Sequence, residues 1–323
     1  MSQNSSINRE ALLSGNRRAL AKAITLIEST NSQDRSAADE LVQSILPDSG
    51  RSLRIGISGT PGVGKSTFIE ALGLHITGLG KKLAVLAVDP SSPVNGGSIL
   101  GDKTRMERLS REENAFIRPS PSSGQLGGVA QKTRESILLC EAAGFDVILV
   151  ETVGVGQSEI EVASMVDFFL LLMQPNSGDE LQGIKRGILE LAQALVINKA
   201  DGDGLAFANQ TQAHCQSAVE LLSTGAPWKT KVLTCSALKN KNIDKVWEML
   251  ESYAQQGKEN GMIEQRRRGQ NRDWMLKLFQ NLLEQHLDAR HGFSQAKNDV
   301  ARSVESGQTT AYAGAKELLS LLK

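Results

Sequence analysis

Short, nearly continuous apolar runs alternate with amphipathic segments through the central part of the chain. The runs are rich in Val, Ile and Leu and lie at residues 53–58, 83–88, 115–117, 147–150, 168–173, 194–197 and 231–234. Strands that are covered by helices on both faces have this composition. A strand–helix repeat of this kind connects through right-handed crossovers. The pattern therefore predicts an α/β fold with a mainly parallel, doubly wound sheet.

Helical spacing of apolar residues dominates both ends of the chain. It covers residues 8–46 with a break at Gly15, and it returns after Ser236 in segments near 246–253, 275–287 and 308–322. Gly257 and Gly261 flank a predicted hinge. We therefore expect an N-terminal helical extension at 1–50, a central sheet domain at 51–256 and a C-terminal helical arm at 257–323.

The run at 53–58 leads into a glycine-rich loop that is followed by a helical segment. The loop reads Gly59-x-x-x-x-Gly64-Lys65-Ser66, which is the spacing of a phosphate-binding loop in its strand–loop–helix context. Its glycines let backbone N–H groups turn toward phosphates, and the helix N-terminus adds partial positive charge. Lys65 is expected to reach the β- and γ-phosphates, and Ser66 to bind Mg²⁺. The predicted triphosphate site comprises Gly59, Gly62, Val63, Gly64, Lys65, Ser66 and Thr67.

A second loop predicts which base is bound. Asn198-Lys199-Ala200-Asp201 follows the apolar run at 194–197. The Asp201 carboxylate can accept two hydrogen bonds from guanine, whereas adenine offers no such donor pair and would leave a buried carboxylate unpaired. Lys199 is expected to lie across the base, and Asn198 to tie this loop to the phosphate loop. The backbone of Ser236-Ala237-Leu238 is expected to meet the guanine carbonyl. The substrate is therefore predicted to be GTP.

Three carboxylates are candidates for completing the magnesium site with Ser66. Mg²⁺ prefers oxygen ligands, usually one or two carboxylates together with hydroxyl, phosphate and water oxygens. Asp89 and Glu151 each end an apolar run, and Asp102 lies in a glycine-rich stretch. Each could instead be a helix cap or a surface carboxylate. The predicted metal ligands are Ser66, Asp89, Asp102 and Glu151.

The segment from Glu151 to Gly154 resembles the DxxG switch of regulatory GTPases, with Glu in place of Asp. Gly154 is expected to contact the γ-phosphate and to move away after hydrolysis. Ras-like proteins hold a water-positioning glutamine at the position of Val155, and the nearest glutamine here is Gln157. We therefore expect slow hydrolysis unless a partner or second subunit completes the site. The predicted catalytic residues are Lys65, Glu151, Asp89 and Gln157.

Composition excludes several other classes of protein. Lys plus Arg equals Asp plus Glu at 36 each, and this balance argues against a dedicated binder of nucleic acid or anionic membranes. No apolar stretch approaches the roughly 18–20 residues of a membrane span. The first residues resemble neither a signal peptide nor a transit peptide. Cys140, Cys215 and Cys235 are predicted to be reduced, buried thiols, so a cytoplasmic location is expected.

Four arginines gather shortly before the segment at 275–287. The pattern favours a solvated helix face, with a docking surface for an acidic partner as the alternative. The four residues are Arg266, Arg267, Arg268 and Arg272.

Several long motifs occur together and in order: GTPGVGKST, VDPSSPVNGGSILGDKTRM, PSPSSGQLGGVAQKTRE, ETVGVGQSE and NKAD. Together they resemble the MeaB/ArgK family, the methylmalonyl-CoA mutase-associated GTPases, over nearly the whole chain. This resemblance implies a homodimeric G protein that associates with the cobalamin-dependent mutase. It implies that GTP hydrolysis gates loading of adenosylcobalamin and protects or reactivates the mutase.

The resemblance also implies where conformational switches lie. Two family switch regions correspond to residues 95–105 and 154–164, and a third, partner-responsive loop corresponds to residues 176–186. Within that loop, Asp179, Glu180 and Lys185 are implied coupling residues. Family members dimerise through the helical tail.

Other functions remain open from the residues. A metal-insertion GTPase for nickel or cobalt usually carries clustered histidines or cysteines, whereas His75, His214, His286 and His291 are scattered. A phosphotransferase, which matches an older transport-kinase label for the family, would need an acceptor pocket with a base. A nucleotide-sensing scaffold would bind GTP and hardly hydrolyse it.

Overall fold

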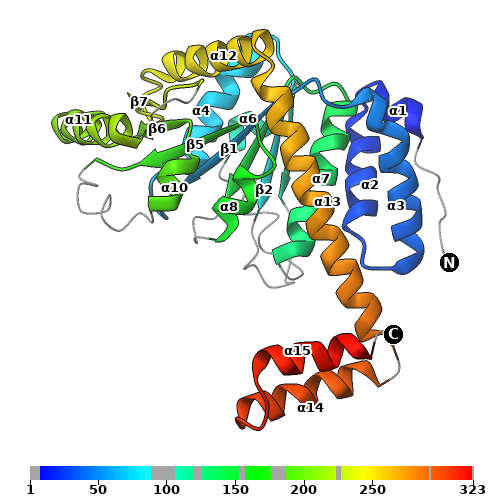
Figure 1. Ribbon diagram of the computed structural model, residues 1–323. Helices are drawn as coiled ribbons and strands as arrows, with labels where there is room; N and C mark the ends of the chain where they lie inside the picture. The colour runs from blue at the N-terminus through cyan, green and yellow to red at the C-terminus, as the bar shows by residue number, and fades with distance from the viewer. Residues whose placement is uncertain are drawn as a thin grey trace. The chain divides into compact units, whose positions relative to one another are not determined.

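The fold is a seven-stranded, entirely parallel sheet in the order β3-β2-β4-β1-β5-β6-β7 (Figure 1). The computed structural model describes residues 8–88, 106–119, 126–152, 157–175, 186–222, 227–290 and 292–321. The strands are β1 Leu53–Gly59, β2 Leu83–Val88, β3 Ala115–Pro119, β4 Val147–Thr152, β5 Phe168–Met173, β6 Ala194–Ile197 and β7 Lys231–Thr234. Each predicted run forms a strand, and the predicted doubly wound α/β class is confirmed.

Helices cover both faces of this sheet. Ile55 and Ile57 of β1 point into a core formed with α4 and α12, whereas Gly56 between them faces α8. Burial on both faces explains why the strands are apolar throughout. The helices around the sheet are α4 Lys65–Gly78, α6 Glu107–Ser110, α7 Leu126–Ala142, α8 Gln157–Ala163, α10 Arg186–Leu191, α11 Gly204–Leu222 and α12 Ile243–Glu259.

The N-terminal helices form an outer layer beside α7 (Figure 1). They are α1 Arg9–Leu13, α2 Arg17–Glu28 and α3 Ser32–Ile45, followed by the 3₁₀ turn Leu46–Asp48. Arg35 of α3 donates to Glu135 of α7 at 2.7 Å, and Arg118 of β3 pairs with Glu28 of α2. The third helix begins at Ser32, because the Asn31 side chain accepts from the Gln33 N–H at 3.1 Å and caps it.

The carboxyl end of α8 packs directly on β1. A Cβ added to Gly56 would lie 2.8 Å from Val162 Cγ1 and 3.1 Å from Val166 Cγ2. Both valines are fully buried. Gly56 therefore permits a close approach between α8 and the strand that leads into the phosphate loop.

Replacing Gly56 by alanine is expected to destabilise the protein by about 1–3 kcal/mol, because the added methyl group overpacks this contact. Urea unfolding monitored by circular dichroism measures the change. Gly128→Ala in α7 is the matched control, since nothing lies within 4 Å of a Cβ there. Equal stability of Gly56→Ala and the wild-type chain would contradict the close packing.

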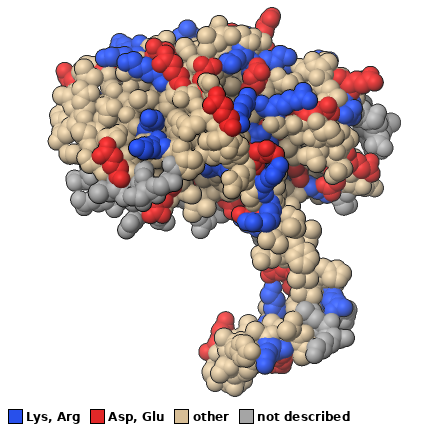
Figure 2. Space-filling view, turned by 45° about the horizontal axis from the view of Figure 1, so that its top comes forward, with Lys and Arg blue, Asp and Glu red and all other residues tan. Residues whose placement is uncertain are grey.

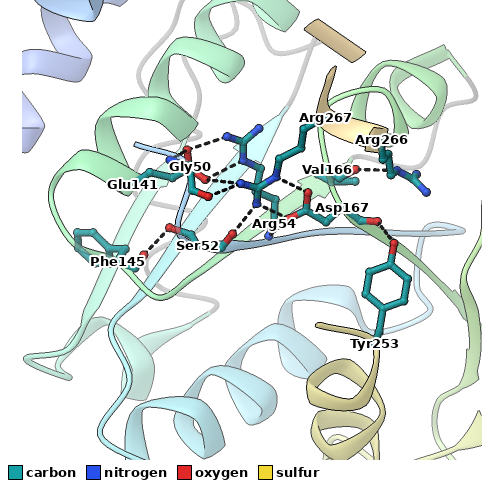
Figure 3. A network of polar contacts seen from close by, with 10 residues as sticks. All are labelled: Gly50, Ser52, Arg54, Glu141, Phe145, Val166, Asp167, Tyr253, Arg266 and Arg267. Carbon is teal, nitrogen blue, oxygen red and sulfur yellow. Dashed lines mark hydrogen bonds and ion pairs between the residues drawn. The ribbon is translucent and has the colours of Figure 1, made fainter. Parts of the chain in front are cut away.

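An ion network links the start of α13 (Met262–Asp288) to the amino ends of the sheet strands (Figure 3). Arg267 donates to both carboxylate oxygens of Asp167 at 2.7 and 2.6 Å, and to the carbonyl oxygens of Gly50 and Ser52 at 2.6 Å each. The Tyr253 hydroxyl donates to the Asp167 carbonyl oxygen at 2.7 Å. These contacts join segments about 100 and 215 residues apart in the sequence and hold the first turn of α13 to the sheet.

This network corrects the interpretation of the arginine cluster as a solvated helix face. Arg266 and Arg267 lie against the sheet domain, and the Arg267 side chain is only 14% exposed. Arg272, by contrast, is 71% exposed and pairs with its neighbour Asp273 at 3.0 Å. The cluster therefore has two different parts, because Arg266 and Arg267 meet buried carbonyl and carboxylate oxygens that Arg272 does not reach.

The chain divides into two compact units, residues 1–267 and 268–323. The second unit comprises most of α13 Met262–Asp288, together with α14 Phe293–Glu305 and α15 Ala311–Ser320. The last two helices pair closely, since a Cβ at Gly314 would lie 2.9 Å from Val300 Cγ1. The predicted domain boundaries at 50/51 and 256/257 remain predictions.

The cysteines and the charged side chains are distributed as the sequence predicted. All three cysteines are buried and unpaired, and burial raises the pKa of Cys215 to about 11 and that of Cys235 to about 12. Positive and negative side chains are interspersed on the face shown in Figure 2. In the described part of the chain, no helix is long and apolar enough to cross a membrane.

Candidate nucleotide-binding site

The loop between β1 and α4 has a conformation that depends on its glycines. Gly62 and Gly64 have φ angles of 83° and 94°, in the left-handed region that favours glycine. A Cβ at Gly59 would lie 2.6 Å from the Leu172 carbonyl oxygen, and one at Gly64 would lie 2.8 Å from Asn198 Nδ2. Val63 is fully buried, while Thr67 is exposed in the first turn of α4. The loop can therefore direct backbone N–H groups to an anion at the α4 N-terminus.

Lys65 lies inside this loop. Its Nζ donates to the carbonyl oxygens of Gly59 at 2.7 Å and Thr60 at 3.3 Å. Burial lowers the pKa of the Lys65 ammonium, and the carboxylates of Glu151 and Glu159 partly oppose that shift. A partly desolvated cation next to loop carbonyl oxygens can form charge-assisted hydrogen bonds to phosphate oxygens.

Ser66 and Glu151 supply oxygen atoms suited to Mg²⁺. The Ser66 hydroxyl donates to Glu151 Oε1 at 3.4 Å, which brings together the first residue after Lys65 and the end of β4. A hydroxyl beside a carboxylate fits the preference of magnesium for oxygen ligands. Among the residues that the structure describes, no group of three His, Cys, Asp or Glu side chains forms another candidate metal site.

Asn198 joins the second loop to the phosphate loop. Its Nδ2 donates to the Val63 carbonyl oxygen at 2.9 Å, and its Oδ1 accepts from the Ala237 N–H at 3.0 Å. Lys199 has a left-handed φ of 58°, and its Nζ donates to the Gly62 carbonyl oxygen at 2.7 Å. The two predicted loops, far apart in sequence, therefore meet at one edge of the sheet, where parallel strands end.

Asp201 is held in place by the loop after β7. The Ser236 hydroxyl donates to Asp201 Oδ2, and the Lys239 N–H donates to the Ser236 hydroxyl oxygen at 3.1 Å. The Ala200 N–H donates to the Cys235 carbonyl oxygen at 2.9 Å. Leu238 is 76% exposed. Each carboxylate oxygen can accept more than one hydrogen bond, so Asp201 keeps acceptor capacity beyond its contact with Ser236.

Sequence reasoning missed a set of polar side chains beneath the phosphate loop. The Thr152 hydroxyl donates to Ser58 Oγ at 2.9 Å, and the Ser58 hydroxyl donates to Glu159 Oε1 at 3.3 Å. All three residues are almost fully buried. The available signal was Glu159 in the motif ETVGVGQSE, since an acidic residue on an otherwise buried helix face requires partners.

Some predicted residues lie outside the part of the chain that the structure describes. They are Asp89, Asp102 and Gly154, together with residues 95–105 and the coupling residues Asp179, Glu180 and Lys185. Gln157 is the first residue of α8, and its predicted role stays a prediction.

Comparisons with known proteins identify relatives along the whole chain. The family model "Methylmalonyl Co-A mutase-associated GTPase MeaB" matches residues 20–292. GTPase ArgK of Escherichia coli is 45% identical over 313 residues, covering 97% of this chain and 95% of that protein. The mouse mitochondrial "Methylmalonic aciduria type A homolog" is 46% identical over 323 residues, covering 97% and 78%.

A solved structure confirms the similarity in three dimensions. It is titled "Crystal structure of LAO/AO transport system kinase", is 37% identical in sequence and superposes with a TM-score of 0.81, covering 100% of this chain and 99% of that one. With a phosphate loop tied to an NKxD loop at one sheet edge and relatives named GTPases, the chain belongs to the family of methylmalonyl-CoA mutase-associated GTPases.

Proposed function

We propose that this chain is a GTP-hydrolysing chaperone of a cobalamin-dependent methylmalonyl-CoA mutase. In this role it gates adenosylcobalamin loading and protects or reactivates the mutase. The observation that carries the nucleotide part is the Asn198 bridge, which joins a phosphate-binding loop to a guanine-type loop. The mutase part is supported by the family description.

Each group has a stated task in this proposal. The phosphate loop N–H groups and Lys65 neutralise the triphosphate, and Asp201 selects guanine. Mg²⁺, when bound, would be held by Ser66 and Glu151, with Asp89 and Asp102 as further proposed ligands, and would neutralise charge on the phosphates. Lys65 is desolvated before substrate arrives, so its contact with phosphate gains strength from a low local dielectric.

Hydrolysis is proposed to depend on the partner, because Val155 occupies the position of the water-positioning glutamine. The test is single-turnover hydrolysis of GTP by the isolated chain and by the chain mixed with methylmalonyl-CoA mutase. We expect the mutase to raise the rate and to co-purify with the chain in the presence of a non-hydrolysable GTP analogue. Fast turnover by the isolated chain, or no response to the mutase, would contradict the chaperone proposal.

The same assay separates the alternatives. A metal-insertion GTPase would respond to nickel or cobalt rather than to the mutase, and a phosphotransferase would move labelled phosphate to an acceptor instead of releasing it. A sensing scaffold would bind GTP and remain inert with every partner.

The proposed homodimer forms through the second unit. Exposed apolar side chains recur along α13 with no buried residue on that helix, which is the pattern of an unpaired helix face. They are Met275, Leu276, Phe279, Leu282 and Leu283.

Ending the chain at Gln270 is expected to give a monomer that still binds GDP. This end point retains Arg266 and Arg267, whose contacts belong to the sheet domain. Light scattering measures the mass, and calorimetry with GDP is the control for folding. An undiminished dimer mass after truncation would place the dimer interface elsewhere.

A further inference from the structure

Different groups contact the two ends of α8. The helix begins directly after the segment predicted to contact the γ-phosphate, and near this amino end Glu159 accepts a hydrogen bond of 3.3 Å from Ser58. Ser58 is the residue before Gly59 of the phosphate loop. The amino end of α8 is thus linked to the nucleotide site through the hydroxyl of Ser58.

The carboxyl end of α8 is bound by arginines from two other elements. Arg134 of α7 donates its Nη2 to the Ser164 carbonyl oxygen at 2.7 Å and to Ser164 Oγ at 2.8 Å. Arg266 of α13 donates its Nε to the Val166 carbonyl oxygen at 3.2 Å (Figure 3) and its Nη2 to the Ala163 carbonyl oxygen at 3.5 Å. Both guanidinium groups therefore bind the turn that directly follows α8, at residues 163–166.

This arrangement is stabilising for a clear physical reason. A backbone carbonyl oxygen needs a hydrogen-bond partner, and a charged guanidinium N–H donor makes a stronger bond to it than a neutral donor does. Packing adds a third attachment, because Val162 and Val166 sit against Gly56 of β1. Arg267, the next residue after Arg266, is itself fixed by Asp167 at 2.6 Å. Arg266 is therefore next to a residue that is bound to the sheet domain.

We infer that Arg134 and Arg266 are positioning residues that hold the carboxyl end of α8 as a fixed pivot. Rearrangement caused by the γ-phosphate is then confined to the amino end, where Glu159 faces the phosphate loop. This inference rests on the proposed GTPase function. Without the pivot, the helix moves as a whole, and discrimination between GTP and GDP weakens along with the rate of hydrolysis.

The test compares Arg266→Gln and Arg134→Gln with Arg272→Gln, a matched control on the exposed part of α13. Calorimetry gives the affinity for GDP and for a non-hydrolysable GTP analogue, and single-turnover assays give the hydrolysis rate. We expect Arg266→Gln and Arg134→Gln each to lower the preference for GTP over GDP by about five-fold or more, and to lower the hydrolysis rate by a similar factor. This is the lower range of typical coupling between sites. GDP affinity should stay unchanged, because the phosphate and base loops are intact.

Arg266→Lys keeps a cation near the carbonyl groups and is expected to recover part of the loss. If the arginines had a purely structural role, the variants would have a lower melting temperature and an unchanged nucleotide preference. Nucleotide affinities and hydrolysis rates are therefore measured at a temperature where every variant is folded. Wild-type preference and rate in both Arg134→Gln and Arg266→Gln would overturn the pivot. Failure of the wild-type chain to bind GTP would instead overturn the proposed function.

Discussion

Replacing Lys65 by alanine is expected to lower GTP turnover by about 100- to 1000-fold, the loss that follows removal of one donor aimed at developing charge. Lys65 is the cation placed inside the phosphate loop, where its Nζ now donates to the Gly59 carbonyl oxygen at 2.7 Å. Charge-assisted hydrogen bonds to phosphate are roughly twice as strong as neutral ones. Alanine supplies neither the charge nor the donor. Phosphate release measured with saturating GTP gives the effect.

The control for this experiment is Lys245→Ala, which removes an exposed lysine from α12. The fold of Lys65→Ala should be retained, because the hydrogen bonds of Lys65 within the described part of the chain go to two carbonyl oxygens of its own loop. GTPase activity close to that of the Lys245 variant would remove the phosphate-loop assignment.

Asp201→Asn is expected to weaken GTP binding by about 100-fold and to permit binding of xanthosine triphosphate. Hydrogen bonds to charged groups contribute about 1.5–3 kcal/mol each, and the carboxylate is proposed to accept two from guanine. The Ser236 hydroxyl donates to one oxygen of residue 201. In Asp201→Asn, the Ser236 hydroxyl is expected to donate to the amide oxygen, which turns the amide N–H group toward the base. Xanthine has a carbonyl oxygen where guanine has its amino group, and this oxygen can accept from that N–H group.

Calorimetry with GTP and xanthosine triphosphate measures this exchange of specificity. Asp203→Asn is the matched control, since Asp203 is exposed two residues further along the same loop. An unchanged preference for GTP in the Asp201 variant would rule out the guanine assignment.

Local sequence patterns predicted the sheet well, and they placed the two candidate nucleotide loops on segments that the structure brings together. Each apolar run became a strand, and Asn198 tied the second loop to Val63 as expected. These features depend on short-range requirements: a buried strand must be apolar on both faces, and a tight loop needs glycine at positions such as Gly62.

Helix ends were less accurately predicted because single side chains decide them. The last helix begins at Ala311 rather than near Gln308, since Thr310 caps it by accepting from the Ala313 N–H at 3.2 Å. A separate helix at 293–305 was also missed, because its amphipathic pattern runs on from the preceding segment.

The amino-acid sequence by itself determined the parallel sheet, the phosphate loop and the guanine-type loop, because each requires particular residues at fixed short spacings. Only the tertiary structure decided where Arg134, Arg266 and Arg267 donate their hydrogen bonds. Their partners lie about 30 to 215 positions away and are mostly backbone carbonyl oxygens. Every residue carries such an oxygen, so no pattern in the side chains marks it as a partner before the chain has folded.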